Sequence, residues 1–517
     1  MASLGSSSAK VMLSRMVTVG VGFVCAPILS RMFDRDQYGV AGIVESMSYW
    51  AIGFAALGYS QAIPLSENEG EFRGLVRLNF VINAALVVVL SLLVLAFGDA
   101  IARWFGGGDG ASALGGRHPV ARLIWYLPAL FLVSALSDTA QYAFSWQGRF
   151  GLLSWLVVST GLSQPLQIVA GWLFGGTASM LLLGALLSGV TGAVIVCVCL
   201  VPQVAGTGGK AGTMRDAAWR RQQFPRVQLW NTVLLMTSYA MPVIAFGILF
   251  AASDMGAVGS FNRGRKLIML PVMVLAISLG QVFYPQAADE WQRNRSARDS
   301  IMGTFRILSI LCVFPTVCLC YLGPLMFSLF LGEQWREAGV YAQLCGPYVI
   351  FLIFAGPLKW MYLIRERTGR FFVYNVLTTI GEPVGLAVGA LIGGTAVLKD
   401  LTGFGGFSGL DGARAAVLAY ALAGSLTRAP QVVEAIRLGG VHLGEVVGIV
   451  AREIAVAMIV LLPAGAVYWA GGPDMAAVAL ACAAGLAYLA IVYRRDEAVR
   501  RWVARRIGWE KEEEAAS

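Results

Sequence analysis

The chain has 517 residues, of which 57% are hydrophobic and only 13% are charged, with a net charge of +9 and a mean hydropathy of +0.69. Soluble domains average about 25% charged residues, so this chain lacks the charges needed to cover its surface in water. The composition therefore excludes a soluble globular protein and predicts an all-α, multi-pass membrane protein.

The N-terminus predicts an uncleaved membrane helix. Residues 1–10 are short and polar, and the apolar run that follows, 11–33, is long enough to span a bilayer. A cleavable signal peptide has a shorter apolar region and a small-residue cleavage site. We therefore expect residues 11–33 to remain as the first span.

Apolar runs of about 20 residues predict fourteen membrane-spanning helices along the chain. They cover residues 11–33, 40–63, 79–97, 122–145, 151–174, 178–201, 227–250, 258–284, 303–330, 341–364, 371–394, 413–432, 446–470 and 475–493. The runs at 122–145 and 413–432 are interrupted by charges, Asp138 and Arg428.

Loop charges predict the orientation. With both termini in the cytoplasm, 24 of the 39 Lys and Arg residues lie in or next to the inner loops and tails, and eight lie in or next to the outer loops. Cytoplasmic loops of membrane proteins carry such an excess of basic residues. The pattern predicts a multi-pass protein of the cell inner membrane with both termini cytoplasmic. It also accounts for the net charge without a nucleic-acid partner.

Cysteines and histidines predict neither a metal site nor a cofactor. Only two histidines are present, and no cysteine pair has metal-site spacing. The cysteines all fall inside apolar runs, where a free thiol behaves as a small hydrophobic side chain. They are Cys25, Cys197, Cys199, Cys312, Cys318, Cys320, Cys345 and Cys482.

Internal repeats predict two halves of the same orientation. Four pairs of segments match at offsets between 215 and 221 residues: Gly148-Arg149-Phe150 with Gly369-Arg370-Phe371, Gln164-Pro165 with Glu382-Pro383, Pro27-Ile28-Leu29 with Pro242-Val243-Ile244, and Tyr38-Gly39 with Met255-Gly256. Parallel repeats place a substrate site between the halves. We expect six-helix halves at 1–201 and 227–440, a cytoplasmic linker at 202–226, helices 13 and 14 at 441–493, and a basic and acidic cytoplasmic tail at 494–517.

Three groups of residues carry a family resemblance over about residues 10–440. They are Ser14-Arg15 with Ala26 to Phe33 and Tyr38-Gly39; Leu57-Gly58-Tyr59 with Ala62-Ile63; and Leu270-Pro271 with Val282 to Pro285. They resemble the first, second and eighth helices of the multidrug/oligosaccharidyl-lipid/polysaccharide (MOP) flippase superfamily, especially its Wzx-type polysaccharide branch.

The resemblance implies a V-shaped pair of six-helix bundles around a polar cavity. The two extra C-terminal helices suit the lipid II and polysaccharide branches. The related lipid II flippase has basic residues that match Arg15 and Lys266. It also has a basic pair at the end of its second helix, where this chain has the uncharged Tyr59-Ser60-Gln61-Ala62.

Seven basic residues remain once those in or next to the loops are counted, and they are candidate site residues. They are Arg15, Arg263, Arg265, Lys266, Lys359, Arg428 and Arg452. A charge within a span costs about 2.5–3.5 kcal/mol on insertion scales, so it usually faces a cavity or a partner. Arg263, Arg265 and Lys266 lie near an outer end, where they could also reach outer headgroups; we expect them to face the cavity with Arg15. Lys359 and Arg452 lie nearer inner ends, where anchoring to headgroups is expected.

The acids Glu45, Asp138 and Glu382 lie inside predicted spans and are candidate site residues. Each can pair with a base or carry a coupling proton or sodium ion. We expect Glu45 and Asp138 to form structural ion pairs. Glu382 stands beside Pro383, where a broken helix exposes carbonyl groups to a cation, so it is the main candidate for coupling.

These features predict a transporter with no catalytic centre that flips an undecaprenyl-pyrophosphate-linked oligosaccharide by alternating access. Basic side chains would hold the diphosphate while the polyprenyl tail stays in lipid. A multidrug or cation antiporter of the same superfamily is the alternative, although organic cations should prefer acidic cavities. A membrane glycan polymerase or ligase is disfavoured, because the longest outer loop, 98–121, has only 24 residues. A polysaccharide polymerase is a possible partner in a complex.

Overall fold

The computed structural model describes residues 2–105, 119–205, 214–394 and 411–495. Most of the predicted tail 494–517, part of the linker 202–226 and part of the outer loop 98–121 lie outside these residues. Across the described residues the secondary structure is helical, without a β-strand. The all-α prediction is confirmed.

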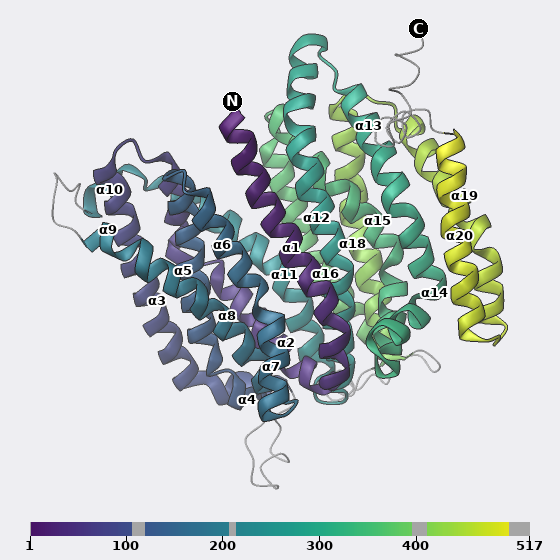
Figure 1. Ribbon diagram of the computed structural model, residues 1–517, viewed down its shortest axis with the longest axis horizontal. Coiled ribbons are helices and arrows are strands. Elements are labelled where there is room, and N and C mark those ends of the chain that lie inside the picture. Colours follow the sequence, from purple (N-terminus) through teal and green to yellow (C-terminus); the bar gives the residue numbers. More distant parts are fainter. Residues whose placement is uncertain (1, 106–118, 206–213, 395–410, 496–517) are drawn as a thin grey trace, which may run out of the picture. The chain divides into compact units, whose positions relative to one another are not determined.

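The helices follow one another along the chain with short connections (Figure 1). The first part contains α1 (Ala2–Met32), α2 (Arg35–Ile52), η1 (Ala55–Leu65), α3 (Glu69–Arg103), α4 (Pro119–Leu123), α5 (Tyr126–Trp146), α6 (Phe150–Gly161), α7 (Ser163–Phe174), α8 (Ala178–Cys199), α9 (Val201–Ala205) and α10 (Met214–Arg220). The remainder contains η3 (Phe224–Gln228), α11 (Leu229–Phe250), α12 (Met255–Asn294), α13 (Arg298–Leu308), η4 (Ser309–Val313), α14 (Phe314–Leu331), η5 (Glu333–Trp335), α15 (Arg336–Ile364), α16 (Thr368–Gly393), α18 (Gly412–Leu438), α19 (Leu443–Trp469) and α20 (Asp474–Arg495).

Each of the fourteen predicted spans overlaps a helix of the structure. Not all of these helices are long and apolar enough to cross a membrane. Among the described residues, ten helical segments are long and apolar enough to cross a membrane, and α2 with η1 makes an eleventh as a bent pair. The other three predicted spans coincide with α5, α12 and α18, which are not among these. The count of fourteen spans therefore stays a prediction.

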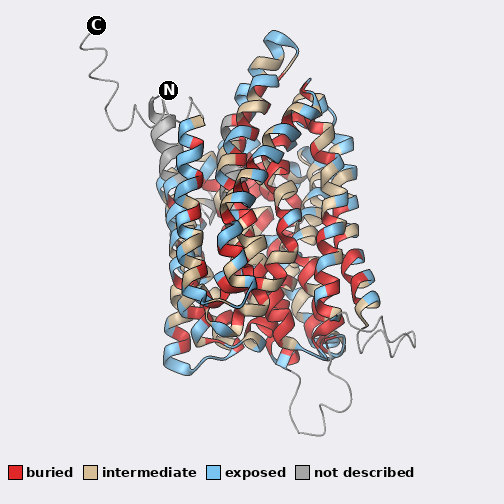
Figure 2. Cartoon of the chain, turned by 90° about the vertical axis from the view of Figure 1, so that its right-hand side faces the viewer, coloured by how far each residue is buried: buried red, intermediate tan, exposed pale blue. Residues whose placement is uncertain are grey.

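Large apolar side chains are exposed along the helices, as a lipid environment requires. Leu95, Trp172 and Leu426 are examples, and in the span Glu69–Arg103 only 11% of the most apolar window is buried. Figure 2 shows exposed residues along the helices, with buried residues concentrated where helices pack together. Apolar faces of this extent are not left in water by soluble monomers.

The chain divides into two compact units. The first comprises Met1–Leu270, Phe327–Tyr341 and Phe372–Thr427, and the second comprises Pro271–Met326, Ala342–Phe371 and Arg428–Ser517. The residues expected to bind substrate or carry coupling all belong to the first unit: Arg15, Arg263, Arg265, Lys266, Glu45, Asp138 and Glu382. Lys359, Arg428 and Arg452 belong to the second.

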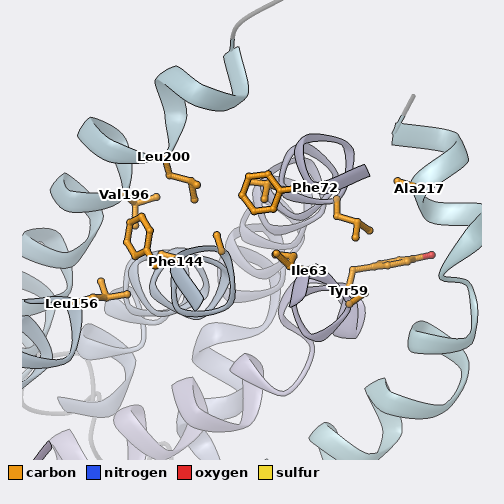
Figure 3. Close-up of a cluster of buried hydrophobic side chains, with 13 residues drawn as sticks. Tyr59, Ile63, Phe72, Phe144, Leu156, Val196, Leu200 and Ala217 are labelled. Carbon is orange, nitrogen blue, oxygen red and sulfur yellow. The ribbon is translucent and has the colours of Figure 1, made fainter. Parts of the chain in front are cut away.

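A cluster of buried side chains joins the early helices of the first unit (Figure 3). Ile63 of η1, Phe72 of α3, Phe144 of α5, Leu156 of α6 and Val196 of α8 meet there, each at most 2% exposed. This packing holds η1 and α3 against α5, which positions the polar groups described below.

The predicted span 40–63 is not one continuous helix. It is bent by 52° between α2 and η1, where Ala56, Leu57 and Gly58 all have positive φ. Only glycine adopts this conformation without strain. The backbone N–H of Ala56, which the break releases from helical bonding, donates to Asn83 Oδ1 of α3 at 2.7 Å.

In the second unit, α19 and α20 are joined by a buried ion pair. Glu453 of α19 is 1% exposed and accepts hydrogen bonds from Arg495 and from the Tyr488 hydroxyl of α20. Arg452 lies 3.5 Å from the same carboxylate.

Removing Arg495 should destabilise this helix pair. Arg495→Met leaves the buried Glu453 with weaker compensation, and breaking a buried pair from one side costs about 3–5 kcal/mol. The exposed neighbour Arg494→Met is the matched control. Thermal unfolding in detergent should show a clear decrease for Arg495→Met alone. Equal melting of the two variants would contradict the structural role of the pair.

Candidate functional site

Glycines let α2 and α12 cross at very short distance. A Cβ atom placed on Gly259 would lie 1.9 Å from Arg35 O, and one on Gly39 would lie 2.4 Å from Met255 O. A Cβ on Gly42 would lie 2.1 Å from Asn262 Nδ2. Since a side chain on Gly39 or Gly259 would collide with backbone atoms, the glycines allow the basic residues of α12 to lie directly against α1 and α2.

Arg263 is buried in protein contacts. It is 6% exposed, and its guanidinium donates to Ser30 Oγ at 3.0 and 3.2 Å and to Ala26 O at 2.9 Å, both on α1. Its Cζ lies 4.8 Å from the ring centroid of Tyr38, a cation–π contact with α2. Arg263 therefore holds three helices together in this conformation, and its predicted substrate contact stays a prediction.

Arg265 bonds to carbonyl groups next to a proline. Its Nη1 donates to Tyr239 O at 2.7 Å and its Nη2 to Ser238 O at 3.4 Å, while its Nε lies 3.3 Å from the Tyr420 hydroxyl. Pro242 of α11 has no N–H, so the carbonyl of Ser238 four residues earlier lacks its helical donor. Arg265 supplies the missing donor to this carbonyl. The Arg265 side chain is only partly buried.

Lys266 forms an ion pair with Glu45. The Nζ–Oε2 distance is 2.5 Å, and the two side chains are 42% and 31% exposed. Glu45 therefore pairs with a base, as expected from the sequence. Because both side chains remain accessible, Lys266 can release the Glu45 carboxylate and bind another anion in its place.

Polar bonds continue from this pair along α2, η1 and α11. Trp50 Nε1 donates to Thr237 Oγ1 at 3.1 Å, and Gln61 Nε2 donates to Thr232 Oγ1 at 3.0 Å. Gln228 Nε2 donates to Gln61 Oε1 at 2.6 Å. These bonds join the two predicted halves within the first unit.

No polar contact joins Arg15 to the basic residues of α12 in the described part of the chain. Arg15 is exposed on α1, eleven residues before Ala26, which corresponds to roughly 16 Å along a helix. In the described part of the chain it has no hydrogen bond or ion pair. A shared site with Arg263, Arg265 and Lys266 stays a prediction.

The remaining acids lie on separate helices. Glu382 is buried in α16, one residue before Pro383. Among the described residues, no base forms an ion pair with Asp138 of α5. The expected ion pair at Asp138 therefore stays a prediction.

Sequence reasoning missed a set of contacts at the end of α1. Ser30 O accepts from Trp335 Nε1 at 2.8 Å and from Gln334 Nε2 at 2.6 Å. Arg31 donates to the carbonyls of Leu329 and Phe330 at the end of α14. These segments are all predicted to lie on the outer side, so their meeting is consistent with the predicted alternation of spans.

Comparison with known proteins gives the family. A model of the family described as polysaccharide biosynthesis protein matches residues 28–339, which include the α2–α12 crossing. The chain belongs to this family. No curated protein matches its sequence.

Solved structures show the same fold at low identity. The lipid II flippase MurJ in an inward closed conformation is 12% identical with a TM-score of 0.65, covering 94% of this chain and 98% of that one. An inward-facing multidrug resistance MATE transporter of the MOP superfamily is 12% identical with a TM-score of 0.61, covering 83% and 95%. MATE in complex with MaL6 is 13% identical with a TM-score of 0.53, covering 84% and 96%. The predicted resemblance to the MOP superfamily is confirmed, and the fold is that of membrane transporters and flippases.

Proposed function

We propose that this polysaccharide biosynthesis family member flips an undecaprenyl-pyrophosphate-linked oligosaccharide across the inner membrane, with no catalytic step. The observation that carries the proposal is the partly exposed Lys266–Glu45 pair beside Arg265, where α2 meets α12. Embedded basic groups that remain accessible are suited to an anionic headgroup. Family membership and the likeness to a lipid II flippase support the same substrate class.

The pair suggests how the headgroup binds. Without substrate, Glu45 neutralises Lys266; a diphosphate then takes the place of the Glu45 carboxylate. Lys266 supplies a point charge, and Arg265 supplies planar donors that bind phosphate in a bidentate way. The polyprenyl chain stays in lipid while the halves 1–201 and 227–440 alternate access. Arg15 and Arg263 complete the proposed substrate set, and Glu45, Asp138 and Glu382 are the proposed coupling groups.

The alternative is a multidrug or cation antiporter, since MATE transporters share the fold. The embedded charges favour the flippase, because bases outnumber acids within the predicted spans. Depletion of the protein in its native cell separates the two functions. We expect lipid-linked oligosaccharide to accumulate on the cytoplasmic face and surface polysaccharide to fall. Unchanged surface polysaccharide with increased drug sensitivity would contradict the proposal. A polysaccharide polymerase that accepts the flipped product remains a proposed partner.

The predicted orientation can be tested at two exposed turns. We expect Asn294, the last residue of α12, to face the cytoplasm and Pro473, the residue before α20, to face outward. In a chain whose eight cysteines are replaced, an impermeant maleimide on intact cells should label Pro473→Cys and not Asn294→Cys. Both should react after permeabilisation, which is the control. The reverse pattern would contradict the cytoplasmic placement of the termini.

A further inference from the structure

Helix α2 is enclosed over most of its length and becomes accessible at one end. It packs against α4, α5, α8 and α11, and it crosses α12 at the glycines described above. Residues 38–48 of α2 are all buried or half-buried, whereas Tyr49 and Trp50, which follow them, are 48% and 41% exposed. The surrounding helices therefore separate toward the end of α2 that is predicted to be cytoplasmic.

The neighbouring helix α11 changes in the same way. None of residues 240–250 is exposed, whereas Leu235 and Tyr239 are 51% and 39% exposed. The hydrogen bond from Trp50 to Thr237 joins the accessible part of α2 to the accessible part of α11. Both helices therefore expose side chains at the same end, which is the inner end in the predicted orientation.

Tyr49 continues the accessible surface of the Lys266–Glu45 pair. It follows Glu45 by four residues on α2, so the two side chains lie on the same face, one turn apart. Lys266 and Glu45 are themselves 42% and 31% exposed. A helical turn rises about 5.4 Å, which is close to the width of one sugar ring. The Tyr49 ring is therefore about one sugar away from the proposed diphosphate site, on its inner side.

The polar groups of this surface change from charged to uncharged toward the inner end. At the crossing of α2 and α12 they are Lys266, Glu45 and Arg265. Further inward, the side chains that bond across α2, η1 and α11 carry only hydroxyl, amide or indole N–H groups. They are Trp50, Gln61, Gln228, Thr232 and Thr237. This order matches a headgroup in which a charged diphosphate is followed by sugars.

We propose that Tyr49 recognises the sugar that is bonded directly to the diphosphate. A sugar ring presents C–H groups on one face and hydroxyl groups along its edge. The negative face of the Tyr49 ring attracts the C–H groups, and the Tyr49 hydroxyl bonds at the edge. Tyr49 thereby distinguishes a loaded lipid carrier from an empty one, which contacts to the diphosphate alone cannot do. This inference rests on the proposed function, because it names the part of that substrate that Tyr49 binds.

Binding to the purified protein in nanodiscs tests the sugar contact. The two ligands are bare undecaprenyl diphosphate and the undecaprenyl-diphosphate-linked oligosaccharide extracted from the native cell. Wild-type protein should bind the linked oligosaccharide more tightly. Tyr49→Leu should lower that affinity about tenfold and leave the affinity for bare undecaprenyl diphosphate unchanged. Lys266→Gln should instead weaken the binding of both lipids.

Two further variants separate the sugar contact from an effect on folding. Tyr49→Phe keeps the aromatic ring and should retain most of the affinity for the linked oligosaccharide. Tyr493→Leu is the matched control, because Tyr493 is another exposed tyrosine of a membrane span, 37% exposed on α20. It should bind both lipids as the wild-type protein does.

The sugar contact and the proposed function fail in different ways. Equal affinity of the wild-type protein for the two lipids would overturn the sugar contact and leave the proposed function standing. So would a Tyr49→Leu protein that binds both lipids as the wild type does, or that loses affinity for both equally. If the wild-type protein binds neither lipid, the proposed function fails, and the sugar contact fails with it.

Discussion

Replacing Lys266 by glutamine should lower the rate of flipping at least tenfold while the protein remains inserted and folded. The variant loses a charge-assisted bond to the diphosphate, worth about 1.5–3 kcal/mol, and every 1.4 kcal/mol is about a factor of ten. Folding should change little, since Lys266 is 42% exposed and exposed ion pairs contribute about 0–1 kcal/mol.

Lys359→Gln is the matched control for this prediction. Lys359 is a second lysine within a predicted span, on α15, where it lies beside the ring of Trp360 and is expected to act as an anchor. Initial flipping rates, normalised to membrane levels, should fall for Lys266→Gln and stay near wild type for Lys359→Gln. Similar rates in the two variants would remove Lys266 from the substrate site.

Arg263→Gln should behave differently from Lys266→Gln. It removes the guanidinium bonds to Ser30 and Ala26 and the contact with Tyr38, all of them buried. We therefore expect the amount of folded protein to fall, measured as the detergent-extracted protein that is monodisperse. The folded protein that remains should keep its specific activity. A stable Arg263→Gln protein with a low flipping rate would instead place Arg263 in contact with substrate.

Gly259→Ala should both destabilise the protein and abolish most transport. The added methyl would meet the Arg35 carbonyl at 1.9 Å, and backbone cannot rotate aside as a side chain can. Overpacking typically costs about 1–3 kcal/mol and occasionally more, and we expect the upper end here. Separation of α2 from α12 would also pull Lys266 away from Glu45.

Substitutions at two further glycines should destabilise the protein less than Gly259→Ala does. Gly42→Ala should be milder than Gly259→Ala, because the atom in the way is the end of the Asn262 side chain. Gly20→Ala on α1 is the control, since nothing lies within 4 Å of the added Cβ. Thermal unfolding should rank Gly20→Ala above Gly42→Ala and Gly259→Ala lowest. A Gly259→Ala protein as stable as Gly20→Ala would refute the close crossing.

The helices themselves could be predicted because a bilayer leaves few choices. A long apolar run with no water to bond its backbone must become a helix, so runs such as 178–201 locate α8 to within a few residues. The break in the second span could not be predicted, because Ala56 and Leu57 have no preference for the left-handed conformation that they adopt.

Contacts between residues far apart in the chain could not be predicted from the sequence either. Lys266 and Glu45 are 221 residues apart, and composition identified both as embedded charges without showing that they meet. Arg263 carries the same charge as Lys266 and lies only three residues away on nearly the same face of the helix, yet it is buried against α1 while Lys266 stays partly exposed.

Direct flipping by the purified protein tests the central claim. Proteoliposomes would carry a polyprenyl-diphosphate-linked oligosaccharide in both leaflets, and an impermeant glycosidase would be added outside. We predict that the protein makes the inner-leaflet fraction accessible to the enzyme, and that Lys266→Gln slows this at least tenfold while Lys359→Gln does not. An accessible fraction equal to that of protein-free liposomes, with the protein shown to be folded, would contradict the account.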